Sequence, residues 1–265
     1  MPKTTLTKRI EFSASHRYHN PSWDAARNRA TFGPSNNETG HGHNYLLEVT
    51  LRGEVGGVTG MIINLYDLKR VLTEVLEEFD HKHLNLDTPY FENTLPTMEN
   101  FAWVLWQKFL QRPETKNLES IRLYEDEDLF AEITDAMVNG KPSSPMKAPE
   151  ARISRSYPLS VGCSTPPGKV VGEHHTVEVT IRGPIDPDTG LVTHITALDR
   201  LIQTQVLRRF DGTHLVEDPA FQDKPASPGN LASLIWNLLF QEIPGGQLEK
   251  VALREMRGMA VEFTG

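Results

Sequence analysis

Alternating polar and apolar residues near the N-terminus predict a first β-strand over residues 5–15, which ends at the run His16-Arg17-Tyr18-His19. A polar loop over residues 20–39 follows, and it is too long for a simple hairpin turn. The next predicted strand reaches back to His41 and ends at Gly53, because Val, Thr, Leu and Tyr dominate it. Side chains two apart on a strand point to the same face, so one metal ion can contact both His41 and His43.

Apolar residues at helical spacing predict two helices after this strand. The first helix stops at Asp80-His81, and its apolar face consists of Leu68, Val71, Leu72, Val75, Leu76 and Phe79. The second helix begins at Thr97, a good N-cap, with Glu99 in the first turn where a negative charge suits the helix dipole. Two short strands, residues 120–125 and 129–134, complete a ββααββ unit.

The same pattern returns 130 residues later. Repeated residues in the two halves include the following pairs: Glu48 and Glu178, Arg52 and Arg182, Gly60 and Gly190, Asn100 and Asn230, Trp106 and Trp236, Glu125 and Glu255. Ser227 as N-cap and Pro228 at the first helical position repeat the start signal of the second helix. We therefore predict two domains, residues 1–137 and 152–265, joined by a Pro/Ser/Lys-rich linker over residues 138–151.

The chemistry is not repeated with the fold. At the same offset, Val171 and Glu173 stand opposite His41 and His43. Asp211-Gly212, one position further along, corresponds to Asp80-His81. Glu173 and His175 offer the start of a second metal site, but no third ligand is evident from the sequence. We therefore expect the second domain to lack metal ligands and the chain to bind about one zinc ion.

Composition narrows the class of protein. The 265 residues are 38% hydrophobic, as in ordinary globular proteins, and the net charge of -8 with a pI near 5.7 makes nucleic acid an unexpected partner. No run of eighteen apolar residues and no apolar N-terminal segment is present, so we expect a cytoplasmic protein that binds no membrane. A single cysteine, Cys163, excludes an internal disulfide framework and fits a reducing compartment.

Six motifs, in order, resemble those of the 6-pyruvoyl-tetrahydropterin synthase and 6-carboxy-tetrahydropterin synthase family. The motifs are Phe12-Ser13-Ala14-Ser15-His16, Phe32-Gly33 with Asn36-Asn37, Gly40-His41-Gly42-His43-Asn44-Tyr45, Asp80-His81-Lys82-His83-Leu84-Asn85, Thr97-Met98-Glu99-Asn100 and Tyr124-Glu125. The resemblance covers nearly all of residues 5–134. Residues 152–264 resemble the same fold without its metal site.

The resemblance implies an α+β tunnelling fold (T-fold), in which the antiparallel sheets of ββααββ units assemble into a barrel. It implies that His16, His41 and His43 bind Zn²⁺, and three imidazoles leave a fourth position open, as in a catalytic zinc site. His19 is the nearest rival ligand, but only His16 stands at the position of the family motif.

The resemblance also implies roles for other residues. Asp80 and His81 correspond to an acid/base pair, in which the carboxylate orients the imidazole. Glu125 corresponds to the residue that anchors the pterin ring, since a carboxylate accepts paired hydrogen bonds from the 2-amino group and a ring N–H. Glu255 repeats it, and Thr97 is expected among the substrate-binding residues.

One position departs from the family pattern. Where the family has a cysteine that acts as general base, this chain has Ser35, whose hydroxyl gives essentially no alkoxide near neutral pH. Cys163 lies in the degenerate copy at a predicted turn, where we expect a buried or idle thiol.

The sequence is compatible with two lyase reactions. One is triphosphate elimination from 7,8-dihydroneopterin triphosphate, with proton transfer by His81 and Ser35. The other is an aldolase-like cleavage of the same side chain, which gives 6-hydroxymethyl-dihydropterin, the unsubstituted dihydropterin or the 6-carboxy product. A non-catalytic pterin-binding or scaffold protein is the third alternative. We expect a homo-oligomer, either a trimer or a dimer of two-repeat chains.

Overall fold

The structure is a computed structural model that describes residues 3–139, 149–164, 170–255 and 258–265. Its chain divides into two compact units. Unit 1 comprises Met1–Arg152 with Pro184–Val192, and unit 2 comprises Ile153–Gly183 with Thr193–Gly265. Within the predicted linker, residues 140–148 lie outside the described residues.

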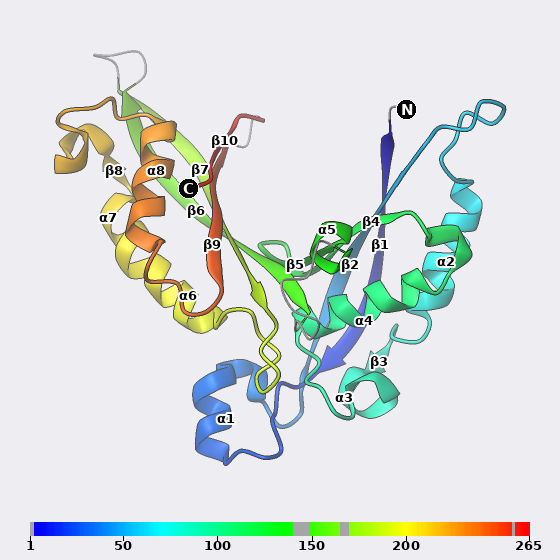
Figure 1. Ribbon diagram of the computed structural model, residues 1–265. Helices are drawn as coiled ribbons and strands as arrows, with labels where there is room; N and C mark the ends of the chain where they lie inside the picture. The colour runs from blue at the N-terminus through cyan, green and yellow to red at the C-terminus, as the bar shows by residue number, and fades with distance from the viewer. Residues whose placement is uncertain (1–2, 140–148, 165–169, 256–257) are drawn as a thin grey trace. The chain divides into compact units, whose positions relative to one another are not determined.

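Five strands form the sheet of unit 1 (Figure 1), in the order β5-β4-β2-β1-β3. The strands are β1 (Thr4–His16), β2 (His41–Gly53), β3 (Lys82–His83), β4 (Leu118–Asp126) and β5 (Leu129–Thr134). Neighbouring long strands run antiparallel, and only β3 runs parallel to its neighbour β1. The register of β1 on β2 pairs His16 with His41, so all three predicted zinc ligands lie at one end of this strand pair.

The helices of unit 1 include both predicted helices. They are α1 (Ala25–Phe32), α2 (Leu65–Leu76), α3 (Leu84–Asp87), α4 (Met98–Leu110) and α5 (Asp135–Asn139), with 3-10 turns at Gly33–Asn36, Pro89–Phe91 and Pro113–Thr115. Helix α4 packs against β4 and β5. The predicted N-cap of α4 is confirmed, because Thr97 Oγ1 accepts a hydrogen bond from the backbone N–H of Asn100 at 3.3 Å.

Helix α1 lies inside the segment that the sequence pattern predicts as loop. Its N-cap is Asp24, whose carboxylate accepts from the backbone N–H of Arg27 at 2.7 Å. Its inner face contributes Phe32 to a small apolar cluster with Tyr18, Leu95 and Leu191. This cluster ties the connection between β1 and β2 to the rest of unit 1.

The main core of unit 1 lies between its sheet and helices α2 and α4. Its largest fully buried side chains include Tyr45, Phe79, Phe101, Trp106 and Phe109. Burying a side chain of this size stabilises the fold by roughly 1.5–3 kcal/mol each. Tyr45 follows His43 on β2 by two residues, so the core is continuous with the histidine pair.

Unit 2 repeats the arrangement. Its sheet has the order β10-β9-β7-β6, with β8 beside β6. The elements are β6 (Glu150–Ser164), β7 (Val170–Pro184), α6 (Ile195–Ile202), α7 (Arg208–Phe210), β8 (Thr213–His214), α8 (Pro228–Leu239), β9 (Gln247–Glu255) and β10 (Ala260–Phe263), with a π-turn at Gln203–Leu207 and 3-10 turns at Leu215–Glu217 and Pro219–Phe221. Helix α8 packs on β9 and β10 (Figure 1). Ser227 caps it as predicted, with Pro228 as its first residue.

These elements confirm the predicted fold class, two tandem α+β units of the T-fold type with antiparallel sheets. The described strands form open sheets, and closure into a barrel stays a prediction about an assembly. One local prediction is wrong. Cys163 lies within strand β6 and not in a turn, because β6 continues to Ser164.

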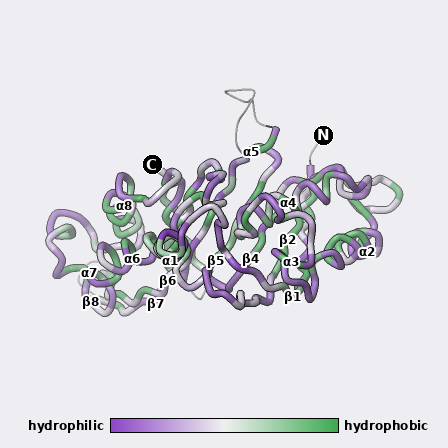
Figure 2. The backbone as a smooth tube through the Cα atoms, turned by 90° about the horizontal axis from the view of Figure 1, so that it is seen from below, coloured by the Kyte–Doolittle hydropathy of each residue, from purple (hydrophilic) through white to green (hydrophobic). Residues whose placement is uncertain are grey.

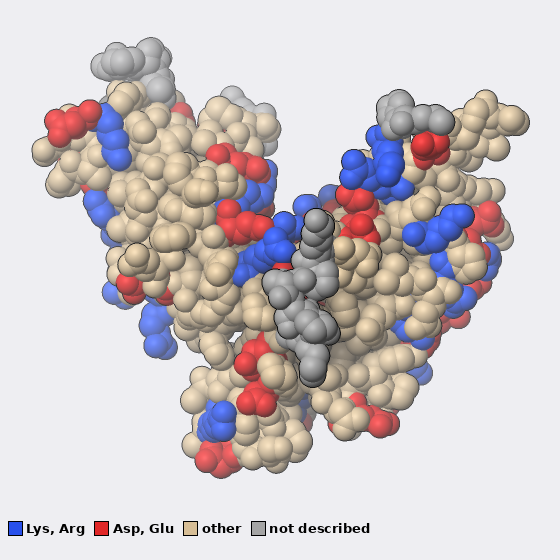
Figure 3. Space-filling view, in the orientation of Figure 1, with Lys and Arg blue, Asp and Glu red and all other residues tan. Residues whose placement is uncertain are grey.

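Hydrophobic and hydrophilic positions interleave along the helices, α2 among them (Figure 2). Among the described residues, no helix is long and apolar enough to cross a membrane. Lys and Arg side chains are interspersed with Asp and Glu over the visible face (Figure 3). The expectation that nucleic acid is not a partner stays a prediction.

The equivalent N-caps of α4 and α8, Thr97 and Ser227, allow a prediction about helix stability in which each serves as the control for the other. Thr97 is fully buried and its hydroxyl also donates to the carbonyl of Gly190 at 2.6 Å, whereas Ser227 only caps its helix. We expect Ser227→Ala to lower the local stability of α8 by about 1 kcal/mol, and Thr97→Ala to lower that of α4 by about 2 kcal/mol. Amide hydrogen exchange of the two helices measures both, and equal losses would contradict the structural role assigned to the Gly190 contact.

Candidate metal centre and acid/base pair

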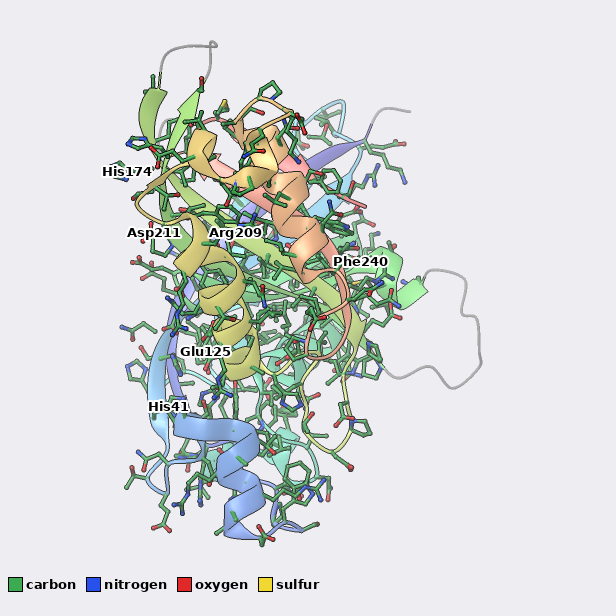
Figure 4. The ribbon with its side chains drawn as sticks, turned by 90° about the vertical axis from the view of Figure 1, so that its left-hand side faces the viewer. His41, Glu125, His174, Arg209, Asp211 and Phe240 are labelled. Carbon is green, nitrogen blue, oxygen red and sulfur yellow. The ribbon has the colours of Figure 1, made fainter. Side chains whose placement is uncertain are left out.

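Four side chains converge at the end of the β1/β2 pair. They are His16 on β1, His41 and His43 on β2, and Glu125 at the end of β4, and their ligand atoms all lie within 4.8 Å of one another. The Nε2 atoms of His16 and His41 are 3.2 Å apart, and Nε2 of His43 is 3.0 Å from a Glu125 oxygen. His41 and Glu125 are labelled in Figure 4. The structure thus brings together the three histidines that the sequence singles out and adds a carboxylate.

A backbone carbonyl determines which ring nitrogen of His16 carries a proton. Its Nδ1 lies 3.0 Å from the carbonyl oxygen of Pro96, and a carbonyl oxygen only accepts, so Nδ1 carries the proton. The lone pair of the neutral ring is therefore on Nε2, the atom that faces His41 and Glu125. A hydrogen bond of this kind from the far ring nitrogen is typical of histidines that bind metals.

The surroundings also keep His41 neutral. Burial, together with the neighbouring rings of His16 and His43, lowers the pKa of His41 to about 4. Its Nδ1 is buried without a hydrogen-bond partner. A neutral imidazole with an unused lone pair is the protonation state that binds a cation.

Glu125 supplies the compensating negative charge. Burial alone would raise its pKa, but the close contact with the rings of His16 and His43 holds that pKa well below its usual range. Burial lowers the pKa of His43, but contact with Glu125 and Asp126 outweighs it and leaves the pKa raised. Tyr18, which is buried, donates to the other Glu125 oxygen at 3.4 Å. The carboxylate is thus held among the imidazoles.

A glycine makes the approach to the histidines possible. Gly40 adopts φ +69°, and a Cβ there would lie 2.8 Å from the carbonyl oxygen of His16 and 2.9 Å from the ring of His83. Both the left-handed backbone and the close contact exclude other residues. Gly40 therefore brings the chain into β2 with His41 opposite His16.

His81 is held in a strained conformation beside Asp80. Its φ is +58°, and it is the one non-glycine residue with positive φ among the described residues. Its backbone N–H donates to the carbonyl of Ser13 at 2.6 Å, and Asp80 accepts from the N–H of Ser13 at 2.8 Å. Asp80 Oδ1 also lies 3.0 Å from Nδ1 of His81. The predicted Asp–His pair is thus formed in the turn before β3, hydrogen-bonded to β1, the strand that carries His16.

His43 and His81 line the same open pocket, which has a volume of about 510 Å³. Its other lining residues come from β1, β2 and the segment around β3: Ser13, Ala14, Ser15, Gly42, Asn44, Lys82, His83 and Asp87. The His81 ring is 81% exposed. The pocket thus connects the histidine cluster to the exposed ring of His81.

Three other predicted residues lie outside this arrangement. Ser35 is half-buried in the turn after α1, where its carbonyl accepts from the N–H of Tyr18, and it does not line the pocket. The hydroxyl of Thr97 is occupied by Gly190 and Asn100. His19 lies beside the amide of Asn36 and lines a second pocket, with Arg17 and Asn85. The roles expected of Ser35 and Thr97 stay predictions.

Glu99 is a buried acid that sequence reasoning treats only as a helix-dipole residue. It is 2% exposed, and its carboxylate accepts from the N–H of Val192 at 3.0 Å. Burial, together with the negative charge of Glu125, raises the pKa of Glu99 to about 8. No local pattern signals this burial, because Val192 is distant in sequence.

In unit 2, a third side chain lies beside Glu173 and His175 that the sequence did not reveal as their neighbour. Cys163 is buried in β6, and its thiol lies with Glu173 and His175 in a group whose ligand atoms are within 4.8 Å of one another. The expectation of a buried thiol is confirmed, and burial raises the pKa of Cys163 to about 12. The expectation that unit 2 lacks metal ligands stays a prediction. Glu255 lies across from His175 on β9.

Comparison with known proteins places these features in a family. The family model for 6-pyruvoyl tetrahydropterin synthase matches residues 5–136 and 166–265. The chain belongs to the 6-pyruvoyl tetrahydropterin synthase family. The two matched segments correspond to a tandem repeat of the family's unit.

Individual relatives match the first repeat. The chain is 41% identical to the 6-pyruvoyl tetrahydrobiopterin synthase of Drosophila melanogaster over 126 residues, 47% of this chain and 75% of the relative. It is 39% identical to the human protein of the same name over 124 residues, 46% of this chain and 86% of the relative. A putative 6-carboxy-5,6,7,8-tetrahydropterin synthase of Archaeoglobus fulgidus is 36% identical over 93 residues, 35% of this chain and 74% of the relative.

A solved structure of the Caenorhabditis elegans 6-pyruvoyl tetrahydropterin synthase covers 51% of this chain and 96% of its own, at 36% identity and a TM-score of 0.49. The relatives named as synthases assign this family member to lyase-type enzymes that act on pterins.

The strain at His81 predicts a stability effect. Gly212 occupies the equivalent position in unit 2 with φ +71° and the same bond to its first strand, from Gly212 N–H to the carbonyl of Ser160. We expect His81→Gly to unfold with a free energy about 1 kcal/mol higher than His81→Ala, because glycine adopts this backbone without strain.

The matched control is Gly212→Ala. A Cβ there meets nothing within 4 Å, so we expect a loss of about 1 kcal/mol from backbone strain alone. Urea titrations measure all three variants. His81→Ala as stable as His81→Gly would show that the backbone at His81 is not strained.

The buried acid predicts a dependence of stability on pH. The unfolded Glu99 ionises near pH 4.5 and the folded one near pH 8, so between these values only the folded state keeps the proton and stability falls as pH rises. Glu99→Gln removes this loss. We expect its free energy of unfolding to rise relative to wild type by up to about 4 kcal/mol between pH 5 and pH 8. A constant difference across this range, in urea titrations at each pH, would contradict the assignment.

Proposed function

We propose that this chain is a zinc-dependent lyase that acts on the side chain of 7,8-dihydroneopterin triphosphate and eliminates triphosphate. The observation that carries the proposal is the convergence of His16, His41, His43 and Glu125 on one point, beside a pocket that also holds His81. The names of the relatives supply the substrate class. The proposal places the protein in the cytoplasm, where its pterin substrate is a small soluble molecule.

The donor set fits Zn²⁺. His16 has its lone pair on Nε2, and His41 has a buried ring nitrogen without a partner, so neutral imidazoles are available as ligands. Glu125 is either a fourth ligand or, as the family resemblance implies, the carboxylate that binds the pterin ring. In both roles it would leave its present contacts with His16 and His43. A bound zinc ion would polarise the side-chain oxygens of the substrate and lower the barrier to removing a neighbouring proton.

His81 moves the proton in this proposal. Asp80 accepts from Nδ1–H, which leaves the lone pair of the imidazole on Nε2, where it can accept a proton from the substrate side chain. Asp80 is itself fixed by the N–H of Ser13, so the ring keeps its orientation. His81 is 81% exposed in the single chain, and the proposed homo-oligomer would enclose this pocket. Ser35 assists proton transfer only if substrate binding brings it closer.

A second candidate reaction is an aldolase-like cleavage of the same side chain. The observation in its favour is the missing thiol, because Ser35 replaces the family cysteine and the single cysteine of the chain lies in unit 2. Cleavage needs the same Lewis acid and His81 as base, without a second base on the side chain.

Single variants separate catalysis from pterin binding. We expect His43→Ala to lose its metal from unit 1 and to reduce product formation from 7,8-dihydroneopterin triphosphate at least about a thousandfold. His81→Gly keeps the metal and pterin binding but reduces kcat by about a hundredfold or more, because general acid/base catalysis contributes on that scale.

Chromatography of the pterin products measures turnover and distinguishes elimination from cleavage. Pterin binding without any product from metal-loaded wild type would support the scaffold alternative and reject the enzyme. Product formation by His43→Ala at the wild-type rate would reject the metal centre.

A further inference from the structure

The first strands of the two units correspond residue by residue when their hydrogen bonds are matched. Ser13 N–H donates to Asp80, and Ser160 N–H donates to Asp211. The short strands agree, because Ala14 pairs with Lys82 in unit 1 and Val161 pairs with Thr213 in unit 2. Three residues after Ser13 comes His16, and three residues after Ser160 comes Cys163.

The second strands correspond in the same way. In unit 1, β2 pairs with β4 through Leu46–Tyr124 and Leu47–Leu123. In unit 2, β7 pairs with β9 through the equivalent pairs Thr176–Arg254 and Val177–Leu253. Glu173 therefore stands at the position of His43, and His175 at the position of Tyr45. Cys163, Glu173 and His175 thus occupy the same end of their strand pair as the histidine cluster of unit 1.

The three side chains form a built site. The thiol of Cys163 and the ring of His175 are fully buried, and Nε2 of His175 lies 2.9 Å from a Glu173 oxygen. Nδ1 of His175 is buried without a hydrogen-bond partner. Such a nitrogen carries an energetic penalty that nothing within the described protein offsets. The neighbouring His174 lies on the other face of β7, as its exposure shows, and Figure 4 marks this end of the strand through its label.

We propose that unit 2 holds a second metal site, in which Cys163, Glu173 and His175 bind a divalent ion of the zinc type. A thiolate, an imidazole and a carboxylate form a mixed donor set that Zn²⁺ and Co²⁺ accept in tetrahedral geometry. Three protein ligands leave a fourth position for water. Binding replaces the thiol proton, which is released to solvent, and the resulting thiolate and Glu173 together balance the charge of the ion.

The proposal changes the expected metal content. The chain would bind two ions, one by histidines alone and one with a sulfur ligand, so the second repeat would carry a remodelled site. The two sites differ in a way that spectroscopy detects. Cys163 is the single cysteine of the sequence, so any sulfur-to-metal signal reports on unit 2 alone.

The test is a Co²⁺ titration of the metal-free full chain under a phosphine reductant, followed by absorption spectroscopy. We expect a thiolate-to-cobalt charge-transfer band in the wild type and two bound ions per chain. Cys163→Ser loses the band and one ion. His41→Ala loses the ion of unit 1 and keeps the band, so this result is independent of the proposed enzymatic function.

Two further variants complete the test. Glu173→Gln preserves the shape of a half-buried side chain. We expect it to weaken, at least about tenfold, the Co²⁺ binding that gives the charge-transfer band. His174→Ala, next to the cluster on the other face, keeps both ions and the band. Far-ultraviolet circular dichroism confirms folding. No band in folded wild type at saturating Co²⁺, or a band of unchanged affinity in Glu173→Gln, would overturn the proposal.

Discussion

The pairing of β1 with β2 is the constraint on which the rest of the structure depends. It sets His16 directly opposite His41, and the alternation of side chains along β2 adds His43 on the same face. A shift of one residue would turn the pair to the other face of the sheet. Charged imidazoles this close would repel one another. The low pKa of His41 keeps that ring neutral, and the carboxylate of Glu125 compensates positive charge on His43.

The two units show how one backbone supports different chemistry. In both units, an aspartate accepts a hydrogen bond from a backbone N–H of the first strand, Asp80 from Ser13 and Asp211 from Ser160. Unit 1 places a strained histidine after this aspartate, where unit 2 has an unstrained glycine. Strain that a glycine would relieve is retained at His81, which points to a functional use of its side chain. In unit 2 the same strand ends carry a thiol, a carboxylate and one imidazole.

Periodicity and capping residues were sufficient to predict the long strands, α2, α4 and the repeat, because each has a strong local signal. Helix α1 was missed, since its short polar sequence has little apolar periodicity and its N-cap, Asp24, resembles a loop residue. The histidines were found from spacing and family motifs. Three features could not be predicted, because they depend on strand pairing and on segments distant in sequence. They are the position of Glu125 beside the histidines, the burial of Glu99 and the position of Cys163 beside Glu173 and His175. The connection after β6 is also shorter than that after β1, so a single offset of 130 hid the match between Cys163 and His16.

The central claim is that the imidazoles of His16, His41 and His43 share one metal ion, and anomalous X-ray scattering from crystals of the zinc-loaded protein tests it most directly. Data collected on both sides of the zinc absorption edge locate the ion without reference to activity. The account predicts a peak within coordination distance, about 2.0–2.1 Å, of one ring nitrogen from each histidine. A fully zinc-loaded crystal with no peak there, or with the three rings turned away from a common point, would contradict it.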